Sequence, residues 1–216
     1  MPRSRFAHTL DLVQTQFTGV LRPLGFSKAG RTYNRPSSEG LVQVINLQIW
    51  RPDPVPPSLP SSQAQGSHDK FTVNLGVWIP EVAEHHLAPP RTKTIREYDC
   101  QVRGRLGQFV EPATDLWWPL NDSWPDSASA ALTLLGAQGL AWLETFATRD
   151  GIIAGWNRAS DARIVIAIIE AKRGRAPRAR QLLAEQIAST RNTAHHQYVH
   201  TVAHQLGIGP LPDAST

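Results

Sequence analysis

Three histidines near the C-terminus have a spacing that occurs among metal ligands. His196, His200 and His204 recur every four residues, and histidines four apart on a helix can share one ion. The set of three spans about 12 Å at 1.5 Å per residue, which is too long for a single ion on a straight helix. At 100° per residue, His200 and His204 also turn away from the apolar stripe of the segment. We therefore predict solvated histidines, no metal and no cofactor.

A second group could carry catalysis. The acid–histidine run at 84–86 offers Glu84 and His85, while Cys100 is followed closely by Arg103 and Arg105, whose charges could lower the pKa of a thiol. The run at 84–86 lacks the HExxH spacing, and strand alternation turns Cys100 away from both arginines. The chain also has no phosphate loop, dinucleotide fingerprint or nucleophile elbow. An enzyme that uses Glu84, His85 or Cys100 stays an alternative, and we predict no catalytic residues.

Two arginines and two tryptophans have the residue types of a protein-binding surface. Arg103 and Arg105 stand two apart in a predicted strand and therefore share one face of it. Trp117 and Trp118 belong to a residue type that is enriched at interface hot spots. Solvated arginines and core tryptophans would give the same pattern. We predict these four as partner-binding residues.

A basic cluster surrounds the turn between two predicted helices. Its members are Lys172, Arg173, Arg175, Arg178 and Arg180. Residues 157–216 hold 8 Lys and Arg against 4 Asp and Glu, and so carry the whole formal charge of +4. Such a patch can contact phosphates by charge alone. Lys172 and Arg173 also suit the end of a helix without any ligand, because cations there oppose the helix dipole.

These side chains need a sheet to hold them. Apolar residues alternate along 41–50 and 70–79, which predicts two antiparallel strands with one face of each in a core. Five prolines in 51–68 predict an exposed loop between them. Shorter strands are predicted at 28–35 and 98–106.

Helices should cover this sheet and follow it. Three-to-four-residue apolar periodicity predicts helices at residues 5–24, 126–147, 161–173, 177–189 and 194–206. Gly136 and Gly139 weaken the second of these and mark a possible break. We predict an α+β fold, an antiparallel sheet of about four strands covered by helices, with a C-terminal helical bundle. The predicted domains are an α+β sheet domain at 1–156 and a segment of three helices at 157–216.

Composition narrows the class of protein. Hydrophobic residues make up 41% and charged residues 19%, as in globular proteins. A single cysteine excludes an intramolecular disulfide framework. The N-terminal stretch lacks the apolar core of a secretory signal, and no run reaches the roughly 18 apolar residues of a membrane span. We expect a cytoplasmic protein with no membrane partner.

Six fragments in a fixed order resemble a known family. They read LRPLGFSKAGRTYNR, QVINLQIW, FTVNLGVWIPEV, YDCQVRGRLG, LWWPL and GLAWLETF. From Arg5 to about Ala147 the chain resembles the bacterial family catalogued as domain of unknown function 4304. The resemblance implies an α+β domain and carries over no catalytic residues.

These observations favour a non-catalytic protein-interaction module with an unknown protein partner, of the toxin-neutralising, immunity-like kind. Inhibitors of basic nucleases tend to be acidic, so this basic chain fits that subclass poorly. The alternative is a nucleic-acid-binding protein that uses the basic C-terminal helical hairpin.

Overall fold

Two alternating apolar runs form the central strands of the sheet. They are β3 (Val42–Ile49) and β4 (Lys70–Trp78), which pair antiparallel at eight successive positions and confirm the strands predicted there. The structure, a computed structural model, describes residues 5–50, 70–85, 93–156 and 162–212. Alternation along both strands separates an apolar face, with Ile45 and Leu75 fully buried, from a face that carries Asn46 and Asn74.

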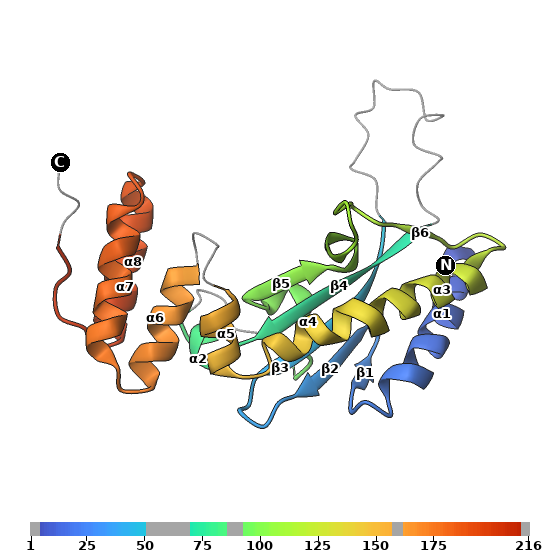
Figure 1. Cartoon of the computed structure of the whole chain (residues 1–216), viewed down its shortest axis with the longest axis horizontal. Coiled ribbons are helices and arrows are strands. Elements are labelled where there is room, and N and C mark those ends of the chain that lie inside the picture. Colours follow the sequence, from blue (N-terminus) through green and yellow to red (C-terminus); the bar gives the residue numbers. More distant parts are fainter. Residues whose placement is uncertain (1–4, 51–69, 86–92, 157–161, 213–216) are drawn as a thin grey trace, which may run out of the picture.

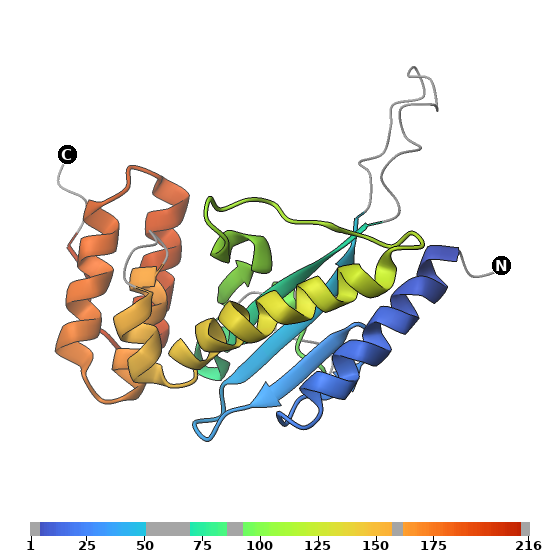
Figure 2. The same cartoon turned by 45° about the vertical axis from the view of Figure 1, so that its right-hand side comes forward.

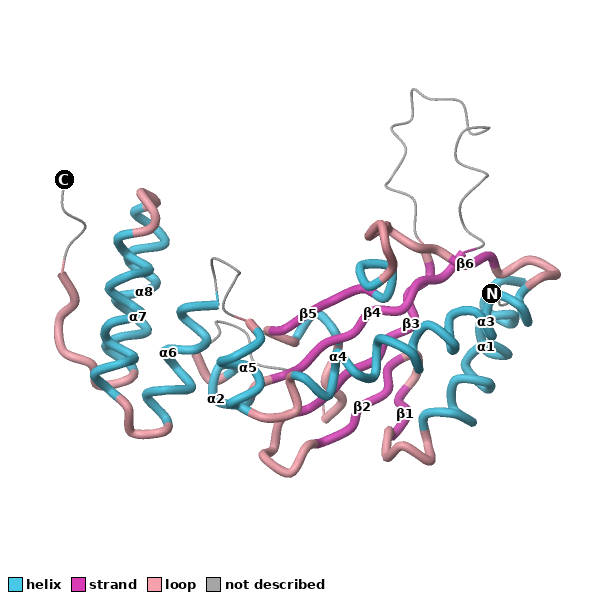
Figure 3. Tube along the Cα trace, in the orientation of Figure 1, coloured by secondary structure: helices cyan, strands magenta, loops and turns pink. Residues whose placement is uncertain are grey.

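Four shorter strands complete the sheet within the described residues. They are β1 (Ser27–Ala29), β2 (Thr32–Pro36), β5 (Val102–Arg105) and β6 (Trp118–Pro119). The order is β1-β2-β3-β4-β5, all antiparallel, and β6 pairs with the start of β4 (Figure 3). The α+β class is confirmed, with more strands than the four predicted.

Two strand boundaries differ from the prediction for local reasons. Residues 28–35 form a hairpin rather than one strand, because Gly30 turns the chain with a positive φ of 61°. At 98–106 the strand begins only at Val102. A 3₁₀ turn, η2 (Glu97–Asp99), precedes it, in which the Asp99 carboxylate accepts a hydrogen bond from the backbone N–H of Arg96 at 2.8 Å.

Helices cover the apolar face of the sheet. They are α1 (Arg5–Leu21), α3 (Trp124–Leu134) and α4 (Leu140–Thr145), and a π-helical turn, η4 (Leu135–Gly139), joins the last two. Figure 2 shows α1 beside the α3–α4 helix over one face. A Cβ at Gly139 would lie 2.8 Å from Leu135 and 3.0 Å from Leu106, so the glycine lets the helix approach the sheet. The helix does not break near Gly136 and Gly139 as predicted, because the backbone stays helical through the π-helical turn between α3 and α4.

The remaining helices lie toward one end of the sheet. They are α2 (Pro80–Ala83), α5 (Arg149–Gly155), α6 (Ala162–Lys172), α7 (Ala176–Ala188) and α8 (Thr193–Gln205). The last three stand together at the end opposite α1 (Figure 1). Gly174, at a φ of 78°, makes the turn between α6 and α7. The Asn192 side chain caps α8 by accepting from the backbone N–H of His195 at 3.1 Å.

One hydrophobic core runs through both the sheet layer and the terminal helices. It includes Phe17 of α1, Phe71 and Leu75 of β4, Ile168 of α6 and Leu183 of α7, all fully buried. A small second cluster, built from Val44, Ile95 and Cys100, lies on the other face of the sheet. The proline-rich loop predicted at 51–68 and the first residue of the helix predicted at 161–173 lie outside the described residues.

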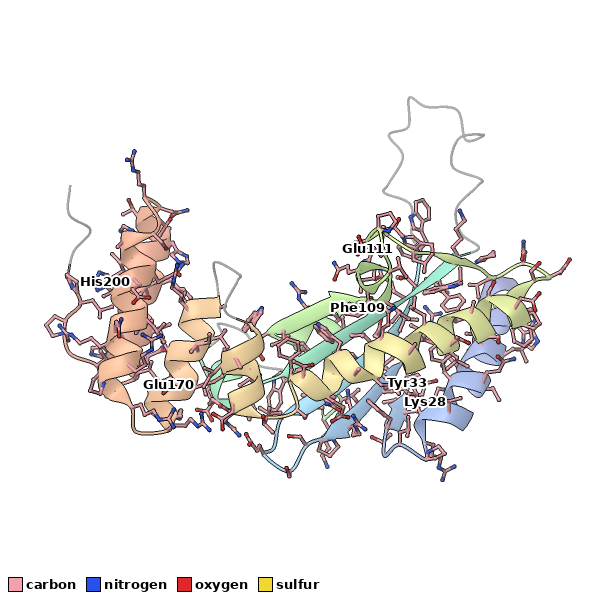
Figure 4. The ribbon with its side chains drawn as sticks, in the orientation of Figure 1. Lys28, Tyr33, Phe109, Glu111, Glu170 and His200 are labelled. Carbon is pink, nitrogen blue, oxygen red and sulfur yellow. The ribbon has the colours of Figure 1, made fainter. Side chains whose placement is uncertain are left out.

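Tyr33 ties α1 to the sheet through its hydroxyl group. The side chain is 1% exposed, donates to the carbonyl of Gln14 at 2.9 Å and lies 3.1 Å from the Thr18 hydroxyl. Burial raises the pKa of Tyr33, and the Thr18 hydrogen bond opposes that shift. β2 and α1 are therefore held by a polar contact inside an apolar layer (Figure 4).

Arg149 fastens α5 to two other segments. Its Nε and Nη2 donate to the two oxygens of Glu81 at 2.6 and 2.8 Å, and its Nη1 donates to the carbonyl of Glu39 at 2.8 Å. The Glu81 side chain is 7% exposed, so Arg149 supplies the hydrogen bonds that its buried carboxylate needs. The same hydrogen bonds to Glu81 raise the pKa of Arg149, which keeps the guanidinium charged at every physiological pH.

Replacing Tyr33 by Phe should lower the free energy of unfolding by about 1 kcal/mol, because the change removes the buried hydrogen bonds that join β2 to α1. Urea denaturation followed by circular dichroism measures this loss. Tyr98→Phe is the matched control, since Tyr98 is 69% exposed, and it should leave the midpoint unchanged. Equal midpoints for Tyr33→Phe and the unsubstituted chain would contradict the assigned hydrogen bonds.

Replacing Arg149 by Met should lower the free energy of unfolding by roughly 3 kcal/mol, because the buried Glu81 carboxylate loses its partner. The control is Arg163→Met, whose ion pair with Glu185 is long, at 4.0 Å, and about 40% exposed. That control should cost less than about 1 kcal/mol. Similar losses in both variants, measured by thermal and urea denaturation, would show that Arg149 has no special role.

Candidate partner-binding site

A row of polar side chains crosses the face of the sheet that the helices leave uncovered. The strand register places Thr32, Asn46, Asn74 and Arg105 side by side on four adjacent strands. Asn46 donates to Thr32 Oγ1 at 3.0 Å, and Arg105 Nε donates to Asn74 Oδ1 at 3.1 Å. Asn74 is 4% exposed and donates in turn to Gln48 Oε1 at 2.7 Å. The row therefore anchors Arg105 from behind.

Asp115 and Trp117 fix Arg105 from the front. One Asp115 oxygen accepts from Arg105 Nη1, and the other accepts from the Trp117 indole N–H at 2.8 Å. The Arg105 guanidinium carbon lies 5.3 Å from the centre of the Trp117 ring, in reach of a cation–π contact. With two guanidinium nitrogens hydrogen-bonded and the Trp117 ring beside the group, Arg105 is held in one orientation.

The same contacts lower the pKa of the Asp115 carboxyl group. Its pKa lies below the ordinary value of 3.8, first because of the hydrogen bond from Trp117 and then because of the one from Arg105. A carboxyl group with a depressed pKa in the folded state stabilises that state above its unfolded pKa. This contribution is lost as the pH falls through the folded value. The site should therefore keep its geometry at neutral pH and loosen in acid.

The loop after β5 forms one wall of the site. It begins with a 3₁₀ turn, η3 (Leu106–Phe109), and returns so closely that a Cβ at Gly107 would lie 2.3 Å from the Thr114 carbonyl oxygen. The backbone N–H of Thr114 donates to the Gly107 carbonyl at 2.9 Å. The Gln108 side chain accepts from the backbone N–H of Arg105 at 3.0 Å. Figure 4 labels Phe109 and Glu111 on this loop beside β5.

An open pocket of about 560 Å³ lies between this loop, β5 and η2. Its lining consists of Asn74, Glu97, Arg103, Gly104, Arg105, Gln108, Ala113, Thr114 and Asp115. Arg103 is exposed and forms no ion pair or hydrogen bond within the described part of the chain. The pocket thus presents one fixed guanidinium beside one that is free to meet a ligand.

The structure brings three of the four predicted partner-binding residues together. Arg103 and Arg105 share a face, as predicted, and Trp117 is half-buried against Arg105. Trp118 departs from this group. It is 7% exposed and its ring centre lies 5.7 Å from that of Phe71, so it packs in the core and is not available to a partner. The strand pairing of β6 turns successive side chains to opposite sides, which separates the two tryptophans.

Tyr98 is an exposed aromatic residue that the sequence interpretation did not select. It follows the pocket residue Glu97 and is 69% exposed. The interpretation placed it in a strand, two residues before Cys100, where alternation would turn both side chains to the same inward face. Asp99 was the available signal in the sequence, because its side chain closes the N-terminus of the turn. Tyr98 is the middle residue of that turn and is exposed.

The basic cluster at the α6–α7 turn is largely paired. Lys172 contacts Glu84 at 3.0 Å, Arg173 contacts Asp150 at 2.6 Å and Arg175 contacts Glu170 at 3.2 Å. Arg178 donates to Gln181 at 2.9 Å and Arg180 to the carbonyl of Gly209 at 3.0 Å. Lys172 and Arg173 thereby join α6 to α2 and α5. Three of the five positive charges already have carboxylate partners.

The candidates for catalysis and metal binding lie apart. Glu84 pairs with Lys172, and His85 Nδ1 lies 2.8 Å from Gln205 Oε1, so both face the terminal helices. Cys100 is 6% exposed and lies beside Gly76, on the sheet face that carries Arg103 and Arg105, so the prediction that it turns away from both arginines is wrong. Burial, with Asp99 and Glu97 nearby, raises its thiol pKa well above 9.0, the reverse of what a nucleophile needs. Cys100 also packs against Gly76, not with Val102 as predicted, because the strand starts after it.

The histidines of α8 make separate contacts. His196 Nε2 lies 2.7 Å from the Thr190 carbonyl oxygen, while His204 is exposed and His200 lies on the outer helix of the bundle (Figure 4). Among the described residues no three His, Cys, Asp or Glu side chains gather closely enough to hold a metal ion. His86 lies outside those residues. Nor does any helix in the described ranges have the length and apolar character to span a membrane.

Comparison with known sequences gives a family match that includes the pocket. The sequence model of the family described as Domain of unknown function (DUF4304) matches residues 58–145, which confirms the resemblance over part of the range from 5 to 147. Every pocket-lining residue falls inside the matched range. No curated protein and no solved structure matches the chain. The fold and the comparison together define an α+β protein that is similar to this family.

Replacing Trp117 by Phe should raise the pKa of Asp115 toward 3.8, because the larger of its two stabilising hydrogen bonds is lost. Carbon-13 NMR of the aspartate carboxyl groups during a pH titration measures the change. Asp150 is the internal control, since its lowered pKa depends on Arg173 at a distant position and should stay lowered. An Asp115 titration that Trp117→Phe leaves unaltered would contradict the assigned contact.

Proposed function

We propose that this protein is a non-catalytic protein-interaction module whose partner binds at the pocket beside β5. The contact surface consists of Tyr98, Arg103, Arg105 and Trp117, and we call it the β5 surface. One observation carries the proposal: Arg105 is held rigidly by Asn74, Asp115 and Trp117, beside an exposed Arg103 that has no partner within the described residues.

The residue types of the β5 surface suit protein recognition. Tyr, Trp and Arg are the side chains most enriched at interface hot spots, because each combines a large contact area with a polar end. Preorganisation matters as much as composition, since side chains that are already ordered lose less entropy on binding. Arg105 and Trp117 are ordered by their mutual contacts, while Tyr98 and Arg103 remain open to solvent.

The contacts of the catalytic candidates support a binding role over an enzymatic one. Glu84 contacts α6 and His85 contacts α8. The Cys100 thiol has a raised pKa and is therefore protonated at neutral pH. The polar groups that do converge, at the pocket, are guanidinium, amide and carboxylate groups held in hydrogen bonds. Such groups orient a ligand, and the described residues that line the pocket include no histidine or cysteine.

The exposed guanidinium of the β5 surface favours an acidic partner. The formal +4 of the sequence lies in residues 157–216, so this preference depends on Arg103, whose side chain has no partner among the described residues. If the partner is a toxin, as the sequence prediction holds, complementarity points to an acidic toxin and away from a basic nuclease. We do not propose nucleic-acid binding, because Lys172, Arg173 and Arg175 already pair with carboxylates and so offer phosphates less charge.

The test is affinity capture compared between surface variants. The unsubstituted chain, Arg103→Glu and Tyr98→Ala are each immobilised and exposed to the same lysate of the source organism, and retained proteins are quantified by mass spectrometry. A partner of the β5 surface should fall at least about tenfold in yield with Arg103→Glu, which corresponds to about 1.4 kcal/mol. Tyr98→Ala should reduce its yield as well, because Tyr98 supplies exposed contact area.

Arg178→Glu is the matched control. It makes the same charge reversal at an exposed position on α7, where the side chain contacts only Gln181 at 2.9 Å. The partner should be retained by this variant as by the unsubstituted chain. The proposal fails if no protein depends on the β5 surface, or if Arg178→Glu and Arg103→Glu reduce the same protein equally.

A further inference from the structure

We infer that the pocket beside β5 binds a single carboxylate group, which an acidic side chain of the protein partner inserts between Arg103 and Arg105. The inference rests on the proposed function for the identity of the partner as a protein. Its own content is the chemistry of the pocket: a monoanionic carboxylate is accepted, and a phosphate is disfavoured.

The donors for such a group are in place. Arg105 uses Nε for Asn74 and Nη1 for Asp115, whereas its Nη2 forms no hydrogen bond within the described residues. Gln108 uses its side-chain oxygen to accept from Arg105, which leaves the Gln108 NH₂ group to donate. Arg103, two residues away on the same face, adds a second guanidinium. Two guanidinium groups and an amide can surround the two oxygens of one carboxylate.

Fixed orientation distinguishes Arg105 from an ordinary surface arginine. A free arginine loses side-chain entropy when it binds a carboxylate, which is one reason that exposed ion pairs contribute little. Arg105 is already ordered by Asn74, Asp115 and the Trp117 ring, so this loss occurred on folding. The carboxylate of a partner therefore meets a prepared site.

The carboxylates of the pocket set the charge that it accepts. Asp115 and Glu97 line it with Arg103 and Arg105, so the described lining residues carry two positive and two negative charges. Both Asp115 oxygens already accept hydrogen bonds, from Arg105 and Trp117, whereas Glu97 forms no ion pair within the described part of the chain. A ligand with one negative charge brings this set to a net charge of only −1 and can pair with Arg103. A phosphate, with close to two charges, would meet stronger repulsion from both carboxylates.

The test compares a glutamate and a glutamine probe, which differ by one charge, and uses inorganic phosphate as a third ligand. Nitrogen-15 NMR follows the arginine Nε–H signals of the full chain at neutral pH and constant ionic strength. The chain is titrated with N-acetyl-glutamate methylamide, N-acetyl-glutamine methylamide or inorganic phosphate. The glutamate probe should shift the Arg103 and Arg105 signals saturably, with an affinity at least about tenfold above that of the glutamine probe. Phosphate should bind more weakly than the glutamate probe.

Arg103→Gln and Arg178→Gln separate site binding from general charge. Arg103→Gln should lower the affinity of the glutamate probe at least about fivefold, whereas Arg178→Gln should leave it unchanged. Both positions are exposed, so neither substitution should disturb folding. Equal binding of the glutamate and glutamine probes, tighter binding of phosphate, or a loss with Arg178→Gln would overturn the inference.

The two proposals can fail separately. If capture of a protein depends on the β5 surface but the glutamate probe does not bind, the carboxylate inference is refuted and the interaction module stands. If the glutamate probe binds in the pocket but no captured protein depends on the β5 surface, the proposed protein partner is refuted and the carboxylate pocket stands.

Discussion

The antiparallel pairing of β3 and β4 is the constraint on which the rest of this structure depends. Eight successive residue pairs fix which side chains face the helices and which face the other way. Because side chains alternate along a strand, a slip of one residue would exchange the buried Ile45 and Leu75 for Asn46 and Asn74. The same register therefore creates the apolar floor for α1, α3 and α4 and the polar row that anchors Arg105.

Several charged side chains in this protein form ion pairs that join one element of the fold to another. Arg149 holds the nearly buried Glu81 by two hydrogen bonds, and Lys172 and Arg173 join the end of α6 to α2 and α5. Two of the five cations of the basic cluster thus join the terminal helices to α2 and α5, and the other three contact residues within the terminal segment. Arg103 differs from these residues because it is exposed, lies at a pocket and has no carboxylate partner among the described residues.

The pocket beside β5 combines a fixed arginine, Arg105, with an exposed one, Arg103. A polar row, a closed loop and a tryptophan ring hold Arg105, and these contacts come from β4 and from the segment 106–117. All of the pocket-lining residues lie in the range that matches the family described as Domain of unknown function (DUF4304). A binding site that is built from the sheet edge and its following loop explains how the domain could present a defined surface without any catalytic group.

The sequence by itself determined the α+β class, the two central strands, the covering helices, and the shared face of Arg103 and Arg105. Each of these follows from local periodicity, which is a property of neighbouring residues. Only the tertiary structure decided that Trp118 is core while Trp117 is not, that Tyr98 projects from a turn, and that the basic cluster is paired. Those outcomes depend on partners far along the chain, such as Asn74 for Arg105 and Asp150 for Arg173, and no local pattern records which distant residues folding brings together.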